Sequence, residues 1–281
     1  MQGGSGSASY LSGTAAVKVT ESPGKIVYQK GESCIDASNA SLGYITVKQG
    51  GLSNRLKLQV IKDDKTYNYD LNNQGNYEAF PLQMGSGTYT VRIMKNLSGS
   101  KYAQVFSASI DVALMDEFTT YLYPNQYVNY TATSEAVQKS FELCAGQETD
   151  LDKVKAVYNF LINNITYDKN LAVTVESGYL PDVDAVLKAK KGICFDYAAL
   201  MAAMLRAQNI PSKLVVGKVA PNGITHAWNE IYIKNVGWIT VGIKANGSSW
   251  ERMDATFGAS KSSDIEKYIG TGSNYTALRV Y

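Results

Sequence analysis

The spacing of apolar residues changes once along this chain, and that change limits what the chain can fold into. Between positions 15 and 123, short runs such as Leu56–Lys62 alternate apolar and polar side chains. From Ser134 onward, apolar residues recur every three or four positions. The first pattern is typical of strands with one face in water, and the second of helices packed against a core. The sequence therefore predicts an α+β chain whose first part is all-β.

Seven short strands are expected in the first part, because turn residues such as Gly, Pro, Asn and Asp separate them. They are Ala15–Thr20, Lys25–Gln29, Tyr44–Lys48, Leu56–Lys62, Tyr77–Leu82, Thr88–Met94 and Val105–Leu114. This number and spacing favour an immunoglobulin-like β-sandwich. We interpret it as a spacer or packing domain, although exposed tyrosines would also suit an adhesion or carbohydrate-binding module.

Three helices are expected before position 192: one from Ser134 to Gly146, one from Thr149-Asp150, and one after Pro181 that Gly192 ends. The predicted organisation is a flexible tether over residues 1–14, a β-sandwich domain over 15–125 and a second domain over 126–281. The Gly- and Ser-rich start and a tyrosine-rich composition favour an exported or cell-surface bacterial protein whose targeting segment has been removed. A cytoplasmic protein with a flexible start is the alternative.

Composition excludes several classes of function. With 27 Lys+Arg against 25 Asp+Glu, the net charge of +2 gives no electrostatic footprint for nucleic acid. The longest apolar run, Tyr197–Leu205, is far shorter than the roughly 20 residues that span a bilayer. Three separated cysteines and one histidine do not make a zinc site, and no Asp-rich calcium loop is present, so we expect no metal and no cofactor. Cys34 and Cys144 are expected to be reduced.

Cys194 is the candidate nucleophile. The turn at Gly192 delivers it to the start of a helix that is expected to run to about Gln208. At a helix N-terminus, free N–H groups and the helix dipole favour the thiolate, so a lowered thiol pKa is expected, and the same N–H groups can hold an oxyanion. A small buried core residue is the alternative reading of Cys194.

The single histidine, His226, starts a predicted strand just after a turn, where it can meet a cleft. A further predicted strand runs from Trp250 to Phe257 and carries Asp254, whose carboxylate could orient the imidazole if this strand lies beside that of His226. We expect the Cys194 sulfur within about 4 Å of one ring nitrogen and Asp254 beside the other.

Five stretches together resemble the transglutaminase-like superfamily of cysteine enzymes. They are Asn164–Asp168 (NITYD), Gly192–Ala198 (GICFDYA), Arg206–Ser212 (RAQNIPS), His226–Tyr232 (HAWNEIY) and Trp250–Thr256 (WERMDAT). Each is weak alone, but they follow one another in the family's order and cover roughly residues 130–260. The resemblance implies a papain-like fold in which a nucleophile helix packs on an antiparallel sheet.

By position, the resemblance makes Cys194 the nucleophile, His226 the general base and acid, and Asp254 the group that orients His226. The backbone N–H of Cys194 would be one oxyanion donor, with Tyr167 a candidate for the second and Trp228 a candidate substrate contact. The family's acid usually follows a first Trp some fifteen residues after the histidine, where this chain has Gly242. Ala255 replaces the proline that usually follows the acid.

The expected activity is acyl transfer from protein or peptide amides, with hydrolysis favoured over amine cross-linking and a cell-wall peptide as one candidate substrate. Cys194 would attack the amide and form a thioester, and water would release the acyl group. A non-catalytic surface or wall-binding module on the same scaffold is the alternative, but such a scaffold has no use for an intact Cys, His and Asp set.

Overall fold

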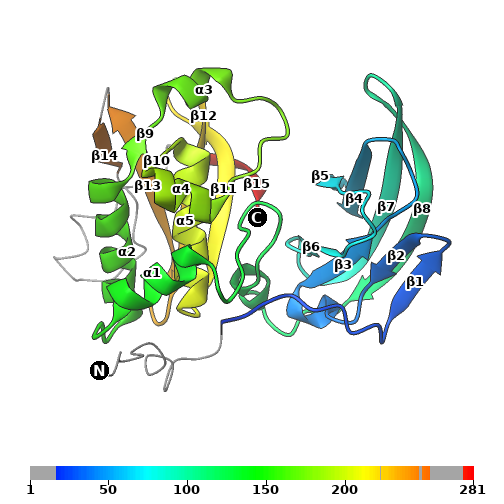
Figure 1. The fold of residues 1–281 in the computed structure, drawn as a ribbon. Helices are drawn as coiled ribbons and strands as arrows, with labels where there is room; N and C mark the ends of the chain where they lie inside the picture. Colours follow the sequence, from blue (N-terminus) through cyan, green and yellow to red (C-terminus); the bar gives the residue numbers. More distant parts are fainter. Residues whose placement is uncertain (1–16, 222, 247–248, 254–274) are drawn as a thin grey trace, which may run out of the picture.

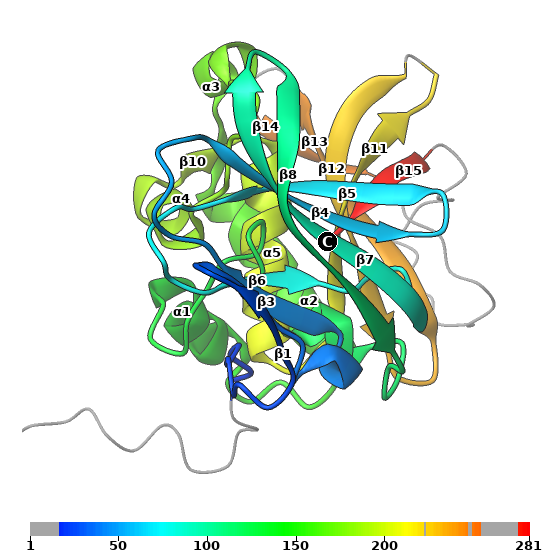
Figure 2. The ribbon, with the colours of Figure 1, turned by 90° about the vertical axis from the view of Figure 1, so that its right-hand side faces the viewer.

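The computed structural model of the chain describes residues 17–221, 223–246, 249–253 and 275–281. Strands β1–β8 form one side of the molecule, and helices α1–α5 with strands β9–β15 form the other (Figure 1). The C-terminal end of β15 lies between the two sides (Figure 1), and in the quarter-turn view of Figure 2 the N-terminal strands lie in front of the helices. Both sides contribute to one continuous set of buried apolar residues.

The N-terminal half contains two four-stranded antiparallel sheets, with strand orders β1-β2-β3-β6 and β5-β4-β7-β8. Apolar side chains from each sheet are buried, for example Ile45 and Val47 from one and Leu58 and Val60 from the other. The bounds are β1 Val27–Lys30, β2 Ser33–Asp36, β3 Tyr44–Lys48, β4 Leu56–Lys62, β5 Lys65–Leu71, β6 Glu78–Pro81, β7 Gly87–Ser98 and β8 Lys101–Val112.

The expected antiparallel β structure is confirmed here, and β3 and β4 have the predicted bounds. The strand expected at Ala15–Thr20 is wrong over residues 17–20, which are not part of a strand although they include strand-forming residues. Strands β2 and β5 were missed. β2 is only four residues long, with Ser and Asp at its ends, whereas β5 alternates Tyr67, Tyr69 and Leu71 with polar residues, a strand pattern that the prediction overlooked. An immunoglobulin-like connection of these strands stays a prediction.

The C-terminal half is built around α5. This helix contacts β11, β12 and β13 on one side and α1, α2 and α4 on the other, which explains why its apolar face is almost continuous. The bounds are α1 Glu135–Cys144, α2 Asp150–Asn164, α3 Lys169–Thr174, α4 Val183–Ala189 and α5 Cys194–Ala207. The prediction that Gly192 ends α4 is wrong: the helix ends at Ala189, and Lys190 takes the left-handed conformation, with φ of 52°.

The sheet against α5 has the antiparallel order β14-β13-β12-β11-β15. Its bounds are β11 Ser212–Val219, β12 Ile224–Ile233, β13 Gly237–Asn246, β14 Ser249–Met253 and β15 Tyr275–Val280, and β9 (Thr166–Tyr167) pairs in parallel with β10 (Lys191–Gly192). The strand with Trp250 therefore lies beside β13 and not beside the His226 strand, contrary to expectation. Residues 243–246 extend β13 and pair with residues 249–252 of β14, so β13 lies between β14 and β12.

The structure gives Arg206, the first residue of the motif between α5 and β11, a clear structural role. Its side chain is 1% exposed and donates three hydrogen bonds to main-chain carbonyls. Nε donates to Ser212 O at 2.9 Å, Nη1 to Tyr123 O at 2.6 Å and Nη2 to Tyr281 O at 3.0 Å. Burial lowers the pKa of Arg206 to about 10, so the group is still a cation at neutral pH. Arg206 thus fastens the end of α5 to β11, the segment after β8 and the C-terminal strand.

Candidate functional site

Cys194 is the first residue of α5, and one residue, Ile193, separates it from the end of β10. The turn before it is fixed by Asp196, whose Oδ2 accepts a hydrogen bond from Ile193 N at 2.9 Å. A Cβ at Gly192 would lie 2.8 Å from the Asp196 Cβ, so only glycine fits there without moving the carboxylate. Asp196 therefore fixes the N-terminal turn from which Cys194 projects.

Asp196 itself is a site residue that the motif comparison missed. It is fully buried, and its Oδ1 accepts a 2.6 Å hydrogen bond from the Tyr179 hydroxyl. Burial raises the pKa of Asp196, while the hydrogen bonds from Tyr179 and Ile193 act in the opposite direction. The available signal was an acidic residue at the third position of a helix, which commonly caps the preceding N–H.

Replacing Asp196 by Asn should change how stability depends on pH. A carboxyl whose pKa is raised by folding stabilises the fold below its unfolded value, near 3.8, and loses that contribution as pH rises through the folded value. Wild type should therefore lose stability relative to Asp196→Asn as pH rises above 3.8, as measured by urea unfolding at a series of pH values. Tyr179→Phe removes a hydrogen bond that lowers the pKa of Asp196, so in this variant the loss of stability should continue to higher pH. Parallel curves for wild type and Asp196→Asn would contradict this assignment.

Strand β12 runs alongside the start of α5, and two contacts fix this arrangement. The backbone N–H of Ala227 hydrogen-bonds the sulfur of Cys194. One turn further along α5, Ala198 O accepts a 2.9 Å hydrogen bond from Asn229 Nδ2, which also donates to Lys213 O at 3.1 Å. Because Asn229 is buried, these bonds hold α5, β11 and β12 together. The residue before Ala227 is His226, so the histidine is carried to the nucleophile end of the helix.

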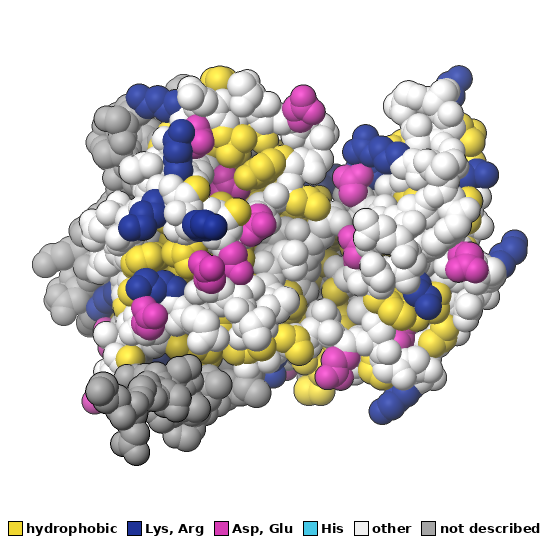
Figure 3. All heavy atoms as spheres, viewed as in Figure 1, with side chains coloured by type: hydrophobic (Ala, Val, Ile, Leu, Met, Phe, Trp, Pro, Cys, Tyr) yellow, Lys and Arg dark blue, Asp and Glu magenta, His cyan; other side chains and the backbone are white. Residues whose placement is uncertain are grey.

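Cys194 and His226 line one cavity of about 320 Å³. Most of its walls are apolar or aromatic, and Glu176 supplies a carboxylate in the exposed segment after α3. The other lining residues are Tyr127, Val175, Gly178, Tyr179, Ile193, Phe195, Val216, Thr225, Ala227 and Tyr281. Figure 3 shows the molecule hollowed between its two halves. The structure thus brings the predicted nucleophile and the predicted base to the same cavity, and the 4 Å contact between them stays a prediction.

The thiol pKa differs from expectation. Burial raises the pKa of Cys194, and the backbone N–H groups of Ala227, Phe195 and Cys194 oppose this without overcoming it. The carboxylate of Asp196, two residues along, raises the pKa further. The expected lowering by the helix N-terminus is therefore wrong for the resting protein. A thiol in this setting needs a base to take its proton when it attacks, and this is the role predicted for His226.

Cys194 and His226 both lie in a segment of the chain that matches a known protein family. Residues 137–243 match the model of the Transglutaminase-like superfamily. Residues 137–243 are therefore similar to a transglutaminase-like core. The matched range extends from α1 into β13, so it includes Cys194 and His226, while Asp254 lies beyond its end.

The individual relatives of this chain are distant. The chain is 27% identical over 118 residues to the uncharacterized protein YebA of Bacillus subtilis (strain 168), a match that covers 36% of this chain and only 16% of that protein. Among solved structures, a candidate cysteine protease from Cytophaga hutchinsonii has 13% identity and a TM-score of 0.39, with 85% of this chain and 91% of that chain covered. Red sea bream transglutaminase has 12% identity and a TM-score of 0.31, with coverages of 71% and 47%.

The two further candidates in the transglutaminase-like core lie near Cys194. Tyr167 lies beside Gly192 in the β9–β10 pair, and burial together with the negative charge of a Cys194 thiolate raises the pKa of its phenol. Trp228 is 2% exposed and its ring packs against Tyr275, with centroids 4.9 Å apart. A Cβ at Gly217 would lie 2.6 Å from the Trp228 ring, so glycine makes room for it. This burial supports a packing role for Trp228; its substrate contact and the oxyanion role of Tyr167 stay predictions.

Asp254, the third member of the predicted triad, lies outside the described residues. Met253 is the last described residue before it and pairs with Gly242 across the β13–β14 ladder. The three cysteines are free, with Cys34 and Cys144 buried and Cys194 partly exposed. In the described ranges, no three His, Cys, Asp or Glu residues are grouped to hold a metal, and no helix is long and apolar enough to cross a membrane.

Proposed function

We propose that this protein is a cysteine enzyme that transfers acyl groups from protein or peptide amides, and that water is the usual acceptor. One observation carries the proposal: Cys194, at the N-terminus of α5, and His226, on β12, line the same cavity. A partly buried thiol with a raised pKa is a poor nucleophile by itself, whereas a thiol beside an imidazole can be deprotonated as it attacks.

In this mechanism the Cys194 sulfur attacks the amide carbon while His226 takes the thiol proton. The oxyanion is held by the backbone N–H of Cys194, at the positive end of the helix dipole, and Tyr167 supplies the second donor. His226 then gives its proton to the leaving amine, and the C–N bond breaks to leave a thioester on Cys194. Water, deprotonated by His226, attacks this thioester and regenerates the thiol.

Asp254 is proposed to orient His226. The family's acid usually occupies the position of Gly242, and the β13–β14 hairpin returns the chain to that position, since Met253 pairs with Gly242. A carboxylate beside the imidazole would fix its tautomer and stabilise the imidazolium. We also retain the proposal that the protein acts outside the cytoplasm, on a peptide substrate such as one from the cell wall.

A peptide library separates the candidate activities. Hydrolysis gives new amino termini, deamidation releases ammonia, and cross-linking incorporates a fluorescent primary amine. We expect new termini or ammonia, both lost in Cys194→Ala and kept in Cys144→Ala, which removes a buried thiol distant from the cavity lining. Amine incorporation as the main product would make the protein a cross-linking enzyme. No Cys194-dependent product of any kind would favour the non-catalytic binding module.

A further inference from the structure

Two tyrosines whose rings contact each other form one wall of the cavity. Tyr127 comes from the segment that follows β8, and Tyr281 directly follows β15; both line the cavity beside Cys194. Their ring centroids are 4.1 Å apart, and the Tyr127 ring lies 5.7 Å from that of Phe195, the residue next to the nucleophile. This wall therefore continues directly to the reacting sulfur.

The tyrosine wall rests on strand β5 of the N-terminal half. Tyr69 is 1% exposed, and its ring centroid lies 6.0 Å from Tyr127 and 6.1 Å from Tyr281, the latter edge-on. Tyr67 packs edge-on against Tyr281 at 5.8 Å, and its hydroxyl accepts a 3.3 Å hydrogen bond from Val280 N. Aromatic pairs of this geometry stabilise their arrangement by about 0.5–1.5 kcal/mol each, so the two β5 rings hold both wall tyrosines in place.

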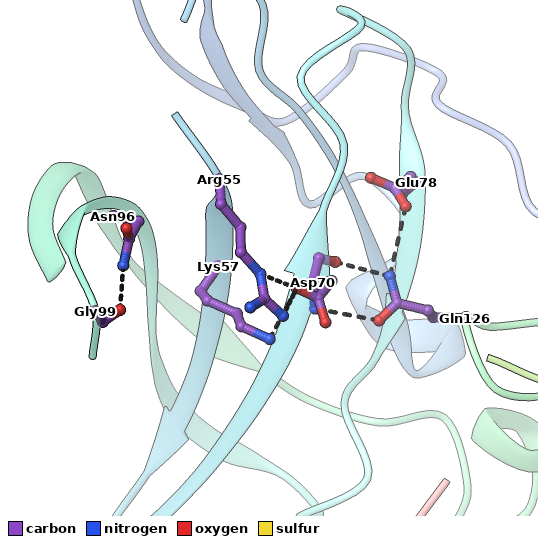
Figure 4. A network of polar contacts seen from close by, with 7 residues as sticks. All are labelled: Arg55, Lys57, Asp70, Glu78, Asn96, Gly99 and Gln126. Carbon is purple, nitrogen blue, oxygen red and sulfur yellow. Dashed lines mark hydrogen bonds and ion pairs between the residues drawn. The ribbon is translucent and has the colours of Figure 1, made fainter. Parts of the chain in front are cut away.

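Polar contacts fix the same elements to one another. Gln126, the residue before Tyr127, pairs with the Asp70 backbone of β5: its Nε2 donates to Asp70 O at 2.7 Å, and Asp70 N donates to its Oε1 at 3.2 Å (Figure 4). The Asp70 carboxylate is held by Arg55 and Lys57 at 3.1 and 2.8 Å. Gly178, which lines the cavity, lies close to the Arg55 and Asp70 side chains: a Cβ at this position would be 3.5 Å from Arg55 Nη2.

We propose that Tyr69 is a positioning residue for the cavity, and that the wall it supports selects peptides with a large aromatic or aliphatic side chain next to the scissile amide. This inference rests on the proposed function. The side chain would lie among Tyr127, Tyr281 and Phe195, where burying an aromatic ring gains more than burying a small residue. The N-terminal half then supports the wall of the substrate site through β5, and is more than the spacer that its lack of acid–base groups suggested.

Thiol-directed peptide reagents test this without a known substrate. Rates of Cys194 alkylation would be measured by mass spectrometry for iodoacetamide and for chloromethyl ketones of acylated Phe and acylated Gly. Wild type should react faster with the Phe reagent than with the Gly reagent. Tyr69→Leu should reduce that preference about fivefold, the loss expected for roughly 1 kcal/mol of aromatic contact, and should leave the iodoacetamide rate within about twofold of wild type. Tyr69→Phe keeps the ring and should keep the preference.

Tyr89→Leu is the matched control. Tyr89 is a buried tyrosine of the same half, but its hydroxyl bonds Leu82 O and Gly85 O instead of supporting the cavity wall. This variant should lose stability yet keep the Phe preference. Equal preferences in Tyr69→Leu and Tyr89→Leu, or no preference in wild type, would overturn the inference. Failure of Cys194 to react even with iodoacetamide would instead refute the proposed function.

Discussion

Replacing Arg206 by Leu should destabilise the protein by about 3–5 kcal/mol, the range for removing one partner of a buried charged interaction. The variant removes the hydrogen bonds from Arg206 to the carbonyls of Ser212, Tyr123 and Tyr281, although Tyr281 O still accepts one from Leu214 N. Each unsatisfied acceptor costs about 1–3 kcal/mol, and relief from burying the cation offsets part of the sum. Urea unfolding should show the loss as a lower midpoint with a similar slope.

Arg206→Lys should recover only part of this stability, since one ammonium group cannot reproduce the forked geometry of a guanidinium. Arg92→Leu is the control, because Arg92 is an exposed arginine on β7. Its effect should stay within about 0.5 kcal/mol, as is usual at exposed positions. A loss of less than 1 kcal/mol for Arg206→Leu would show that its three hydrogen bonds do not hold the halves and the C-terminal strand together.

Replacing His226 by Ala should slow alkylation of Cys194 by iodoacetamide about 100-fold at pH 7, the lower end of what a general base contributes. Burial raises the thiol pKa, so without a base little thiolate is present at this pH. The rate of the variant should recover as pH rises, because hydroxide then removes the proton that His226 took. Labelling of each cysteine would be followed by peptide mapping.

Thr225→Ala controls for changes in access, since Thr225 lines the same cavity one residue before His226. It should leave the rate at pH 7 within about twofold of wild type, as for an exposed residue without a proton-transfer role. Cys34 and Cys144 should label slowly in every variant while the protein stays folded, because both are buried. An unchanged rate in His226→Ala would mean that the histidine does not activate the thiol.

The transglutaminase-like core was predictable because its motifs combine local structure with chemistry. Helix α5 was placed correctly from Gly192 and the apolar run that follows, and β12 from the alternation after His226. Asp196 was missed because the motifs leave its position variable, and its importance depends on Tyr179, which lies 17 residues away in the sequence. The sign of the Cys194 pKa shift was missed for a related reason: the sequence indicates a helix end but not the depth of burial.

The contribution of β5 to the cavity could not be inferred from sequence. Its sequence, KTYNYDL, has the alternation of a strand, but Tyr67 and Tyr69 acquire their role only through Tyr127 and Tyr281. Those contacts join residues that are tens to hundreds of positions apart. The pairing of β14 with β13 was likewise hidden, since the hairpin after Gly242 adds a strand at the edge of the sheet.

The central claim, that Cys194 forms an acyl-enzyme with His226 as its base, is tested most directly with 4-nitrophenyl acetate. Rapid mixing would record the nitrophenolate released, and peptide mapping would locate the acetyl group on the protein. We predict a burst equal to the enzyme concentration, with the acetyl group on Cys194, and a burst rate about 100-fold lower in His226→Ala. An acetyl group found on lysine or another cysteine, or an equal burst rate in His226→Ala, would contradict the account.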